Sequence, residues 1–220
     1  MNKFYSQFNQ DAFLEKYVFK CYKNGFFMDV GANDGITGNN TLYFEENHYW
    51  KGVNFEPIKK AYDKLLITRP NCININSAVS NCNGTAEFLC NDGYPEILSG
   101  LKSNYDSRHL DRLNYENMVS QSTTETIIVD TKRIETICDE HNINHINYLS
   151  IDVEGAEFEV IKSINFEKVF IDVIGFENNY FIESIPIIKY LEDKGYRLLI
   201  QLLDIIMINE KSKFYTGINF

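Results

Sequence analysis

Four carboxylic acids follow apolar segments of this chain where parallel β-strands would end, namely Asp29, Glu56, Asp152 and Glu177. In an open parallel sheet, ligands bind outside the carboxyl ends of the strands. One acid at a solvated strand end is common, but four of them predict an acidic crevice. Such a crevice suits a cationic cofactor or a divalent metal ion such as Mg²⁺, which prefers oxygen ligands. We expect Asp152 beside the reacting centre, and Asp152 with Glu177 as the candidate metal ligands.

The first of these acids leads into a glycine-containing turn. Residues 26–35 read Phe-Phe-Met-Asp-Val-Gly-Ala-Asn-Asp-Gly, which predicts a buried strand and a turn held by Gly31 and Gly35. A pyrophosphate site needs three glycines in a G-x-G-x-x-G pattern, and Asn33 stands where the second glycine is required. S-adenosylmethionine (SAM) contains an adenosine, no phosphate and two positive groups, so it fits this acidic loop better. A plain tight turn is the alternative.

A second acid lies at the offset expected for a nucleoside site. Residues 50–57, Trp-Lys-Gly-Val-Asn-Phe-Glu-Pro, predict the next strand. Glu56 ends it about twenty residues beyond the glycines, where an acid accepts hydrogen bonds from ribose hydroxyls. The loop and Glu56 together favour SAM. An NAD-dependent oxidoreductase and a non-enzymatic ligand-binding module on a Rossmann-like fold are the alternatives, which fold alone cannot separate.

Apolar segments that alternate with amphipathic ones predict a parallel sheet with helices on both faces. After a strand that begins at residue 26, the expected strands cover residues 50–57, 72–79, 84–90, 127–129, 146–153, 169–176, 196–202 and 205–208. The expected helices cover residues 7–22, 39–48, 57–67, 133–141, 155–164 and 184–194. The last two strands are too close for a crossover helix, so one of them should run antiparallel. Glu154 and Glu157 should begin a helix, where the dipole favours negative charge, with Glu157 pointing outward.

Residues 92–124 lack a clean periodicity, and such a segment inside a compact α/β domain is more often functional than spare. We expect this insertion to cover the acceptor substrate. Within it, His109 is a candidate general base, and Tyr105 offers an aromatic face for sugar recognition. Arg108 and Arg112 are four residues apart, so they would share one side of a helix and could bind an anionic group. Packing or a solvated surface is the alternative for each of them.

Length and composition predict a single domain over residues 1–220, with a helical N-terminal segment over residues 1–25. The chain is 44% hydrophobic and 24% charged, and its net charge of −10 argues against a nucleic-acid partner. Its five cysteines are scattered and form no C-x-x-C pair. The N-terminus lacks the features of a signal peptide, and no apolar stretch is long enough to span a bilayer. We therefore expect a cytoplasmic protein without a membrane partner; the oligomeric state stays open.

A series of short motifs extends over most of the chain. In chain order they are Ser6-Gln7-Phe8-Asn9-Gln10-Asp11, Phe27-Met28-Asp29-Val30-Gly31-Ala32-Asn33-Asp34-Gly35, Asn40-Thr41-Leu42-Tyr43-Phe44-Glu45, Gly52-Val53-Asn54-Phe55-Glu56-Pro57, Ala78-Val79-Ser80, Ser99-Gly100-Leu101, Ile151-Asp152-Val153-Glu154-Gly155-Ala156-Glu157 and Glu177-Asn178-Asn179-Tyr180. This ordered combination resembles the FkbM family of SAM-dependent methyltransferases. One departure is Asn39, where many members of the family carry serine.

The resemblance implies a Rossmann-like class I methyltransferase fold with a mostly parallel seven-stranded sheet. It also implies transfer of a methyl group from SAM, usually to a hydroxyl oxygen, with a sugar or another glycan-type small molecule as acceptor. The cofactor-binding residues that it implies are Asp29, Gly31, Ala32, Asn33, Gly35, Asn40, Glu56, Pro57, Ala78 and Asp152, with Gln10 and Asp11 closing over the cofactor.

An alcohol acceptor must lose its proton as the new bond forms. A positioned base typically contributes ~10²–10⁴-fold to such a step. The sequence offers Asp152 or His109 as this base. Alternatively, Asp152 and Glu177 would hold a metal ion that acidifies the hydroxyl.

Overall fold

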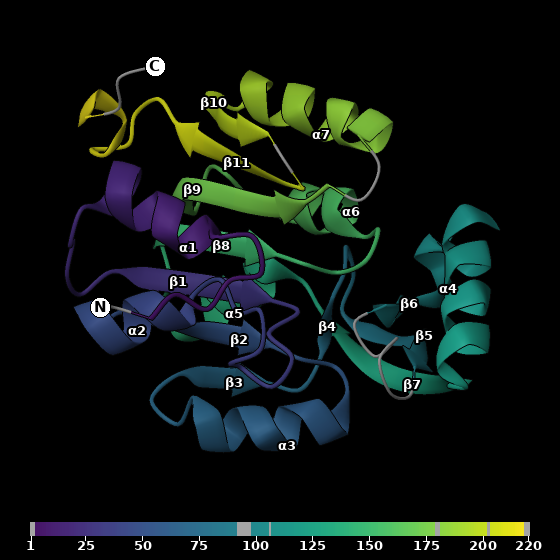
Figure 1. The fold of residues 1–220 in the computed structure, drawn as a ribbon. Helices are drawn as coiled ribbons and strands as arrows, with labels where there is room; N and C mark the ends of the chain where they lie inside the picture. Colours follow the sequence, from purple (N-terminus) through teal and green to yellow (C-terminus); the bar gives the residue numbers. More distant parts are fainter. Residues whose placement is uncertain (1–2, 92–97, 106, 179–180, 202, 218–220) are drawn as a thin grey trace.

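The computed structural model describes residues 3–91, 98–105, 107–178, 181–201 and 203–217. Its main feature is a seven-stranded sheet in the order β10-β11-β9-β8-β1-β2-β3 (Figure 1). The strands are β1 (Phe26–Val30), β2 (Lys51–Phe55), β3 (Ile73–Ile75), β8 (His145–Ile151), β9 (Phe170–Glu177), β10 (Tyr196–Gln201) and β11 (Asp204–Asn209). Strand β11 runs antiparallel to both β9 and β10, and the other pairs are parallel. The expected mostly parallel seven-stranded sheet with an antiparallel strand near the C-terminus is confirmed.

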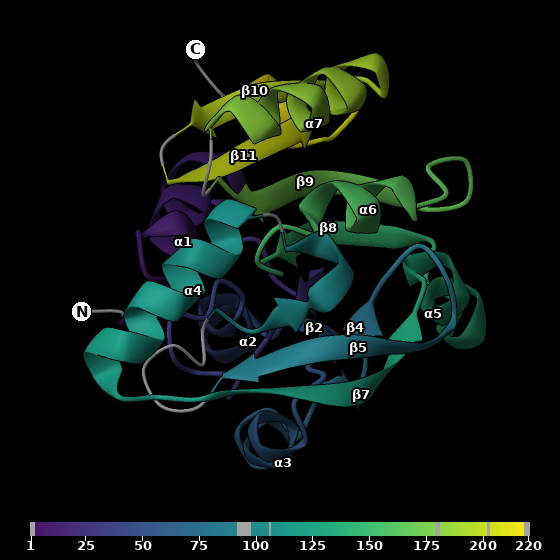
Figure 2. The ribbon, with the colours of Figure 1, turned by 90° about the vertical axis from the view of Figure 1, so that its right-hand side faces the viewer.

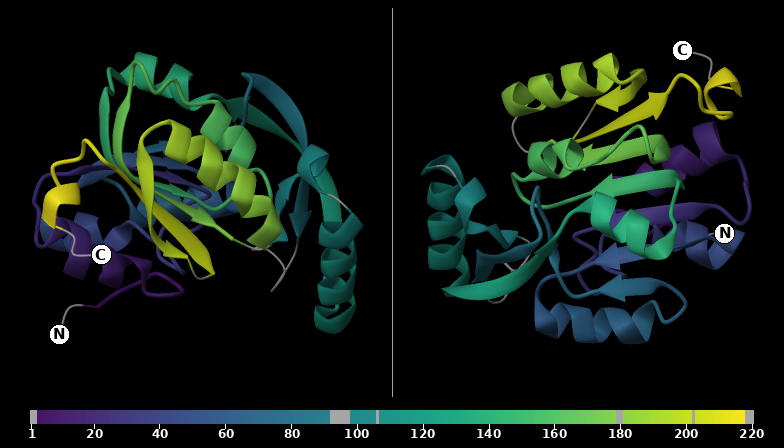
Figure 3. Two further views of the ribbon diagram at one scale, coloured as in Figure 1. Left: turned by 90° about the horizontal axis from the view of Figure 1, so that it is seen from above. Right: turned by 180° about the vertical axis from the view of Figure 1, so that it is seen from behind.

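Helices cover both faces of this sheet, as Figure 3 shows from above and from behind. On one face lie α1 (Gln10–Phe13), which continues into the π-helix η1 (Leu14–Phe19), and α2 (Leu42–His48). On the other lie α5 (Ile134–His141), α6 (Glu157–Lys162) and α7 (Phe181–Asp193). Because strand side chains alternate, Phe27 of β1 packs with the first group and Met28 with the second. Among the described residues, no helix is both long and apolar enough to cross a bilayer.

A second sheet, which the sequence did not predict, stands beside the first (Figure 2). Its order is β4-β7-β5-β6, with β4 (Ala78–Val79), β5 (Gly84–Asn91), β6 (Gly100–Leu101) and β7 (Thr124–Lys132). The single strand expected over residues 72–79 is therefore wrong. It breaks after Ile75, where Asn76 donates from Nδ2 to the carbonyl oxygens of Glu56 and Pro57. Strand β4 then leaves the main sheet and pairs in parallel with β7.

The segment expected to be irregular, residues 92–124, contains the 14-residue helix α4 (Ser107–Ser120) after the short 3₁₀ helix η3 (Lys102–Asn104). The sequence shows no clear helical periodicity here, because α4 buries only a narrow stripe, which includes His109 and Leu113. Strand β7 is also longer than the expected residues 127–129, because polar residues, most of them not buried, extend it at both ends. Residues 92–97 and 106 of the insertion lie outside the described residues. Helix α3 (Lys59–Thr68) lies beside β3 at the edge of the main sheet (Figure 1).

Candidate active site

A cavity of about 640 Å³ opens at the carboxyl ends of β1, β2, β8 and β9. This volume lies within the range of small-molecule sites, about 300–1,000 Å³. All four strand-end acids line it, so the edge predicted from the sequence is one continuous site. Its other walls come from the N-terminal residues Tyr5, Gln7 and Phe8, from the loop over residues 37–40, and from the second sheet with α4.

The loop after β1 is held by backbone contacts on both sides. The amide groups of Gly31 and Ala32 donate to the carbonyl oxygen of Phe55, at 3.1 and 2.9 Å. Gly31 has φ +90°, and a Cβ there would lie 1.9 Å from the carbonyl oxygen of Asp152, so a side chain cannot be accommodated. Gly31, Ala32 and Asn33 line the cavity, whereas Gly35 packs against helix α3, outside the lining.

Glu56 is only 5% exposed, and hydrogen bonds orient its carboxylate. One oxygen, Oε2, accepts from the amide of Asn33 at 3.0 Å, and the other, Oε1, accepts from the amide of Ile58 at 2.7 Å. Asn33 adopts a left-handed conformation with φ +49°, which directs its amide to the acid. A carboxylate offers about four acceptor sites, so Glu56 can also accept hydrogen bonds from ligand hydroxyls. Pro57 follows it in the lining.

Asp29 lies in a buried polar network behind the loop. Its Oδ2 accepts from Asn39 Nδ2 at 2.9 Å and from Thr41 Oγ1 at 2.8 Å. Burial raises the pKa of Asp29, while the nearby Arg69 guanidinium and these two hydrogen bonds oppose the rise. The Oδ1 of Asn39 also accepts from the amides of Thr41 and Leu42, at the start of α2.

Arg69 completes this network, and sequence reasoning missed it. Its side chain is 0% exposed, forms an ion pair with Glu45, and donates to Asn39 Oδ1 and Thr41 Oγ1, each at 3.1 Å. A further bond of 3.3 Å reaches the carbonyl oxygen of Gly35. Nothing in the local pattern of α3 distinguishes this arginine from a solvated one, since its partners are more than twenty residues away in sequence.

Two polar atoms in the cavity lining have unmet hydrogen-bonding capacity. Asn40 donates from Nδ2 to Ser150 Oγ at 3.1 Å, but its buried Oδ1 has no hydrogen-bond partner among the described residues. The same holds for the buried hydroxyl of Ser77, which precedes the lining residue Ala78. A buried polar atom without a partner costs about 1–3 kcal/mol. Both atoms therefore fit a polar ligand that would complete their hydrogen bonds.

Three acids gather at the ends of β8 and β9. Carboxylate oxygens of Asp152, Glu154 and Glu177 lie within 4.8 Å of one another, and all three residues line the cavity. Enclosure by the protein and the charge of Glu154 raise the pKa of Asp152. Burial and the charge of Asp152 raise the pKa of Glu177. The negative charges of the cluster are therefore not fully balanced by positive ones, and a cationic ligand or a metal ion would balance them.

Glu154 and Glu157 do not lie as expected. Helix α6 begins at Glu157, so Glu154 precedes it, with φ +52°, in the acid cluster. Glu157 is buried rather than pointing outward, and its Oε1 accepts from the amide of Gly155 at 3.1 Å. The sequence pattern placed Glu154 at the start of the helix. In the structure, the connection between β8 and α6 is longer than that pattern indicated, so Glu154 lies in the connection.

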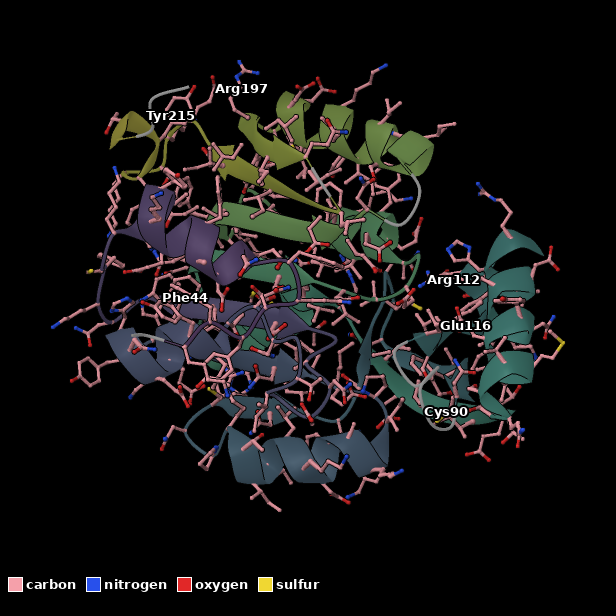
Figure 4. The ribbon with its side chains drawn as sticks, in the orientation of Figure 1. Phe44, Cys90, Arg112, Glu116, Arg197 and Tyr215 are labelled. Atoms are coloured by element: carbon pink, nitrogen blue, oxygen red, sulfur yellow. The ribbon has the colours of Figure 1, made fainter. Side chains whose placement is uncertain are left out.

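Of the residues predicted to contact the acceptor, Arg112 reaches the cavity. It extends from α4 (Figure 4), and its Nη1 lies 3.9 Å from Glu154 Oε2. Arg108 is exposed outside the lining. Tyr105 donates its hydroxyl to the carbonyl oxygen of Leu98, beside strand β6. His109 is buried, with its ring 5.8 Å from that of Tyr105, and is likewise outside the cavity lining.

The raised pKa of Glu177 should make the stability of the free protein depend on pH. The unfolded chain releases the Glu177 proton near pH ~4.3, whereas the folded chain retains it to higher pH. The contribution of Glu177 to the free energy of unfolding is therefore complete below that pH. It is lost as the pH rises toward the pKa of Glu177 in the folded protein. Glu177→Gln should flatten this dependence and raise the Tm near about pH 8 more than near about pH 4. Thermal melts with a chelator present measure it, with the exposed Glu87→Gln as control. Equal slopes for wild type and Glu177→Gln would contradict the assignment.

Comparison with known proteins identifies the family. A family model described as the methyltransferase FkbM domain matches residues 29–198, which is more than half of the chain. The chain belongs to the FkbM methyltransferase family. It therefore carries the methyltransferase domain of this family, whose cofactor is SAM. The strand-loop-acid pattern at Asp29, Gly31 and Glu56 falls within the matched residues.

Two relatives indicate how far this FkbM chain has diverged. Methyltransferase 1 of Beauveria bassiana (strain ARSEF 2860) is 25% identical over 179 residues, which cover 70% of this chain and 68% of that protein. The crystal structure of methyltransferase FkbM from Methylobacillus flagellatus KT superimposes with a TM-score of 0.52 at 10% identity. The superposition covers 84% of this chain but only 43% of that one, so the chain spans less than half of its length. That likeness shows the fold alone.

Proposed function

We propose that this FkbM-family protein transfers a methyl group from SAM to a hydroxyl oxygen of a small acceptor of the sugar or glycan type. The observation that carries the proposal is the composition of a single cavity. At β2 it holds an oriented carboxylate, Glu56, and at β8 it holds Asp152 beside two further acids. A carboxylate suited to a nucleoside and a group able to accept a proton would thus share one enclosure.

The residues of the lining fit SAM. Glu56 would accept hydrogen bonds from the ribose hydroxyls, and Asn40 Oδ1 and Ser77 Oγ would gain hydrogen bonds to the ligand. Asp29 would contribute negative charge toward the positively charged methionine end of SAM. When bound, SAM supplies a methyl group on a sulfonium, which is a good leaving group. The protein then needs to align the acceptor oxygen with that methyl carbon, and such alignment supplies much of the rate gain.

Asp152 is our candidate for the general base. It is exposed to the cavity, so an acceptor hydroxyl can reach it, whereas His109 lies outside the lining. Enclosure and the neighbouring acids raise the pKa of Asp152, which makes its carboxylate a stronger proton acceptor. The second candidate mechanism uses Mg²⁺ held by Asp152, Glu154 and Glu177, which would lower the pKa of the hydroxyl.

Asp152→Asn should lower kcat by about 10²–10⁴-fold, because the amide cannot accept the proton. SAM affinity, measured by calorimetry, should change much less if the role is proton transfer. The exposed Asp130→Asn on β7 is the matched control and should retain full turnover. Turnover that resists EDTA would favour the base, and turnover that EDTA abolishes and Mg²⁺ restores would favour the metal. Wild-type kcat in Asp152→Asn would exclude both roles.

Arg112 would bind an anionic group of the acceptor, since it is a cation on α4 that reaches the cavity.

The proposed methyl transfer is tested by a SAM titration followed by an acceptor panel of neutral sugars, sugar acids and sugar phosphates, with methyl transfer read by mass spectrometry. Transfer to a carbohydrate hydroxyl would support the proposal. SAM binding with transfer only to amines or carboxylates would contradict it. Well-folded protein that binds no SAM would favour a non-enzymatic binding module. The cytoplasmic location and the absence of nucleic-acid and membrane partners stay predictions.

A further inference from the structure

Residues 4–8 form a short segment, here called the N-terminal strap, that crosses in front of α2 and β1 (Figure 1). Tyr5, Gln7 and Phe8 of the strap line the cavity. Ser6 forms a parallel β-bridge with Gly38, which belongs to the loop that lines the same wall. The strap and this loop together therefore close one side of the site.

Two side chains that lie outside the cavity lining hold the strap. Asp11 is 0% exposed, and its Oδ2 accepts from the amides of Tyr5, at 2.6 Å, and Ser6, at 3.2 Å. The hydroxyl of Ser6 donates to its other oxygen. Gln10 is also buried: its Oε1 accepts from the amide of Phe8 at 3.0 Å, and its Nε2 donates to Asp204 Oδ2. Apart from the amide of Ala12, which donates to Asp11 Oδ1 at 2.8 Å, the amides that these two side chains bind belong to the strap.

Apolar packing contributes less to the position of the strap. Phe4 is 38% exposed and Phe8 42% exposed, so neither ring is buried as a core residue would be. The contacts of Phe4 with the Tyr43 ring and of the Tyr5 hydroxyl with Glu46 hold the first residues of the strap against α2. The backbone amides of Tyr5, Ser6 and Phe8 are held by the buried carboxylate of Asp11 and the carboxamide of Gln10.

The orientation of the Gln10 amide follows from its two partners. The amide of Phe8 can only donate, so it requires the oxygen, and the nitrogen is left to face the Asp204 carboxylate. Asp204 pairs with Glu177 across β11 and β9. Gln10 therefore ties the strap to the sheet edge that carries the acids, and a glutamate at position 10 would face Asp204 with like charge.

We propose that Asp11 and Gln10 are positioning residues for methyl transfer: they hold the N-terminal strap as a wall over the SAM-binding cavity, so that Tyr5, Gln7 and Phe8 cover the bound cofactor. This inference rests on the proposed function. A wall of this kind excludes water from the reacting centre and limits the orientations of the cofactor. Neither Asp11 nor Gln10 needs to contact SAM for this role.

Hydrogen exchange and calorimetry on the full chain test the inference with Asp11→Asn, Gln10→Glu and Phe8→Ala. Asp11→Asn should accelerate exchange of the Tyr5 and Ser6 amides and weaken SAM binding by about tenfold, as expected from loss of hydrogen bonds to a charged acceptor. Gln10→Glu should do the same for the Phe8 amide. Asp63→Asn, an exposed acid on α3, is the control and should change neither quantity.

A double-mutant cycle separates positioning from a general loss of fold. If Asp11 acts through the strap, Asp11→Asn and Phe8→Ala should together weaken SAM binding little more than either alone. Full additivity, unchanged strap exchange in Asp11→Asn, or unchanged SAM affinity despite faster exchange would each overturn the inference. Wild-type protein that binds no SAM would instead refute the proposed function and, with it, the positioning role.

Discussion

Replacing Arg69 by methionine should lower the free energy of unfolding by about 3–5 kcal/mol, the usual effect of removing one partner of a buried ion pair. The change leaves the largely buried Glu45 carboxylate without its cation. It also removes donors to Asn39 Oδ1 and Thr41 Oγ1, the residues that bind Asp29. Urea denaturation monitored by circular dichroism measures the loss.

The matched control is Lys59→Met, in the same helix region. Lys59 forms an ion pair with Asp63, but the two side chains are 68% and 55% exposed. Exposed pairs contribute about 0–1 kcal/mol, so this variant should unfold almost as the wild type does. Equal shifts for the two variants would show that Arg69 has no special structural role. Arg69→Met should also weaken SAM binding in the protein that remains folded, because the Asp29 network forms part of the cavity wall.

Replacing Glu56 by alanine should weaken SAM binding by about 10²-fold or more. A hydrogen bond to a charged group contributes about 1.5–3 kcal/mol, and two ribose hydroxyls would lose their acceptor. The amides of Asn33 and Ile58 lose their acceptor as well, so part of the effect comes from a looser loop. Glu56→Gln keeps one acceptor oxygen and nearly the same shape, so its effect should be smaller. Calorimetric titration with SAM measures both variants.

The exposed Glu87→Gln, with wild-type SAM affinity, controls for loss of charge alone. NAD serves as the ligand control and should not bind to any of the variants. Wild-type SAM affinity in a folded Glu56→Ala would contradict the ribose assignment. If Glu56→Ala loses both SAM binding and the circular dichroism spectrum of the folded protein, Glu56 is required for folding. The SAM affinity of Glu56→Gln then tests whether the carboxylate also binds the ribose.

The four strand-end acids lie together in the structure, because backbone geometry alone determines their positions. Side chains at the carboxyl ends of neighbouring parallel strands must meet at one edge, and Asp29, Glu56, Asp152 and Glu177 all line one cavity. Predictions in the insertion fared differently. Tyr105 packs against Gly100 of the second sheet, and His109 packs beside Gly155. Their direction depends on how η3 and α4 lie against the rest of the molecule.

The sequence by itself determined the mostly parallel central sheet, the alternation of most of its strands and helices along the chain, the loop after β1 and the acidic edge. These follow from local periodicity, turn residues and the rule that parallel strands share an edge. Only the tertiary structure decided the second sheet, the burial of Arg69, the entry of Glu154 into the acid cluster and the anchoring of the strap by Asp11. The second sheet and the burial of Arg69 depend on partners distant in sequence, such as Thr131 for Ala78 and Glu45 for Arg69, which local patterns do not reveal.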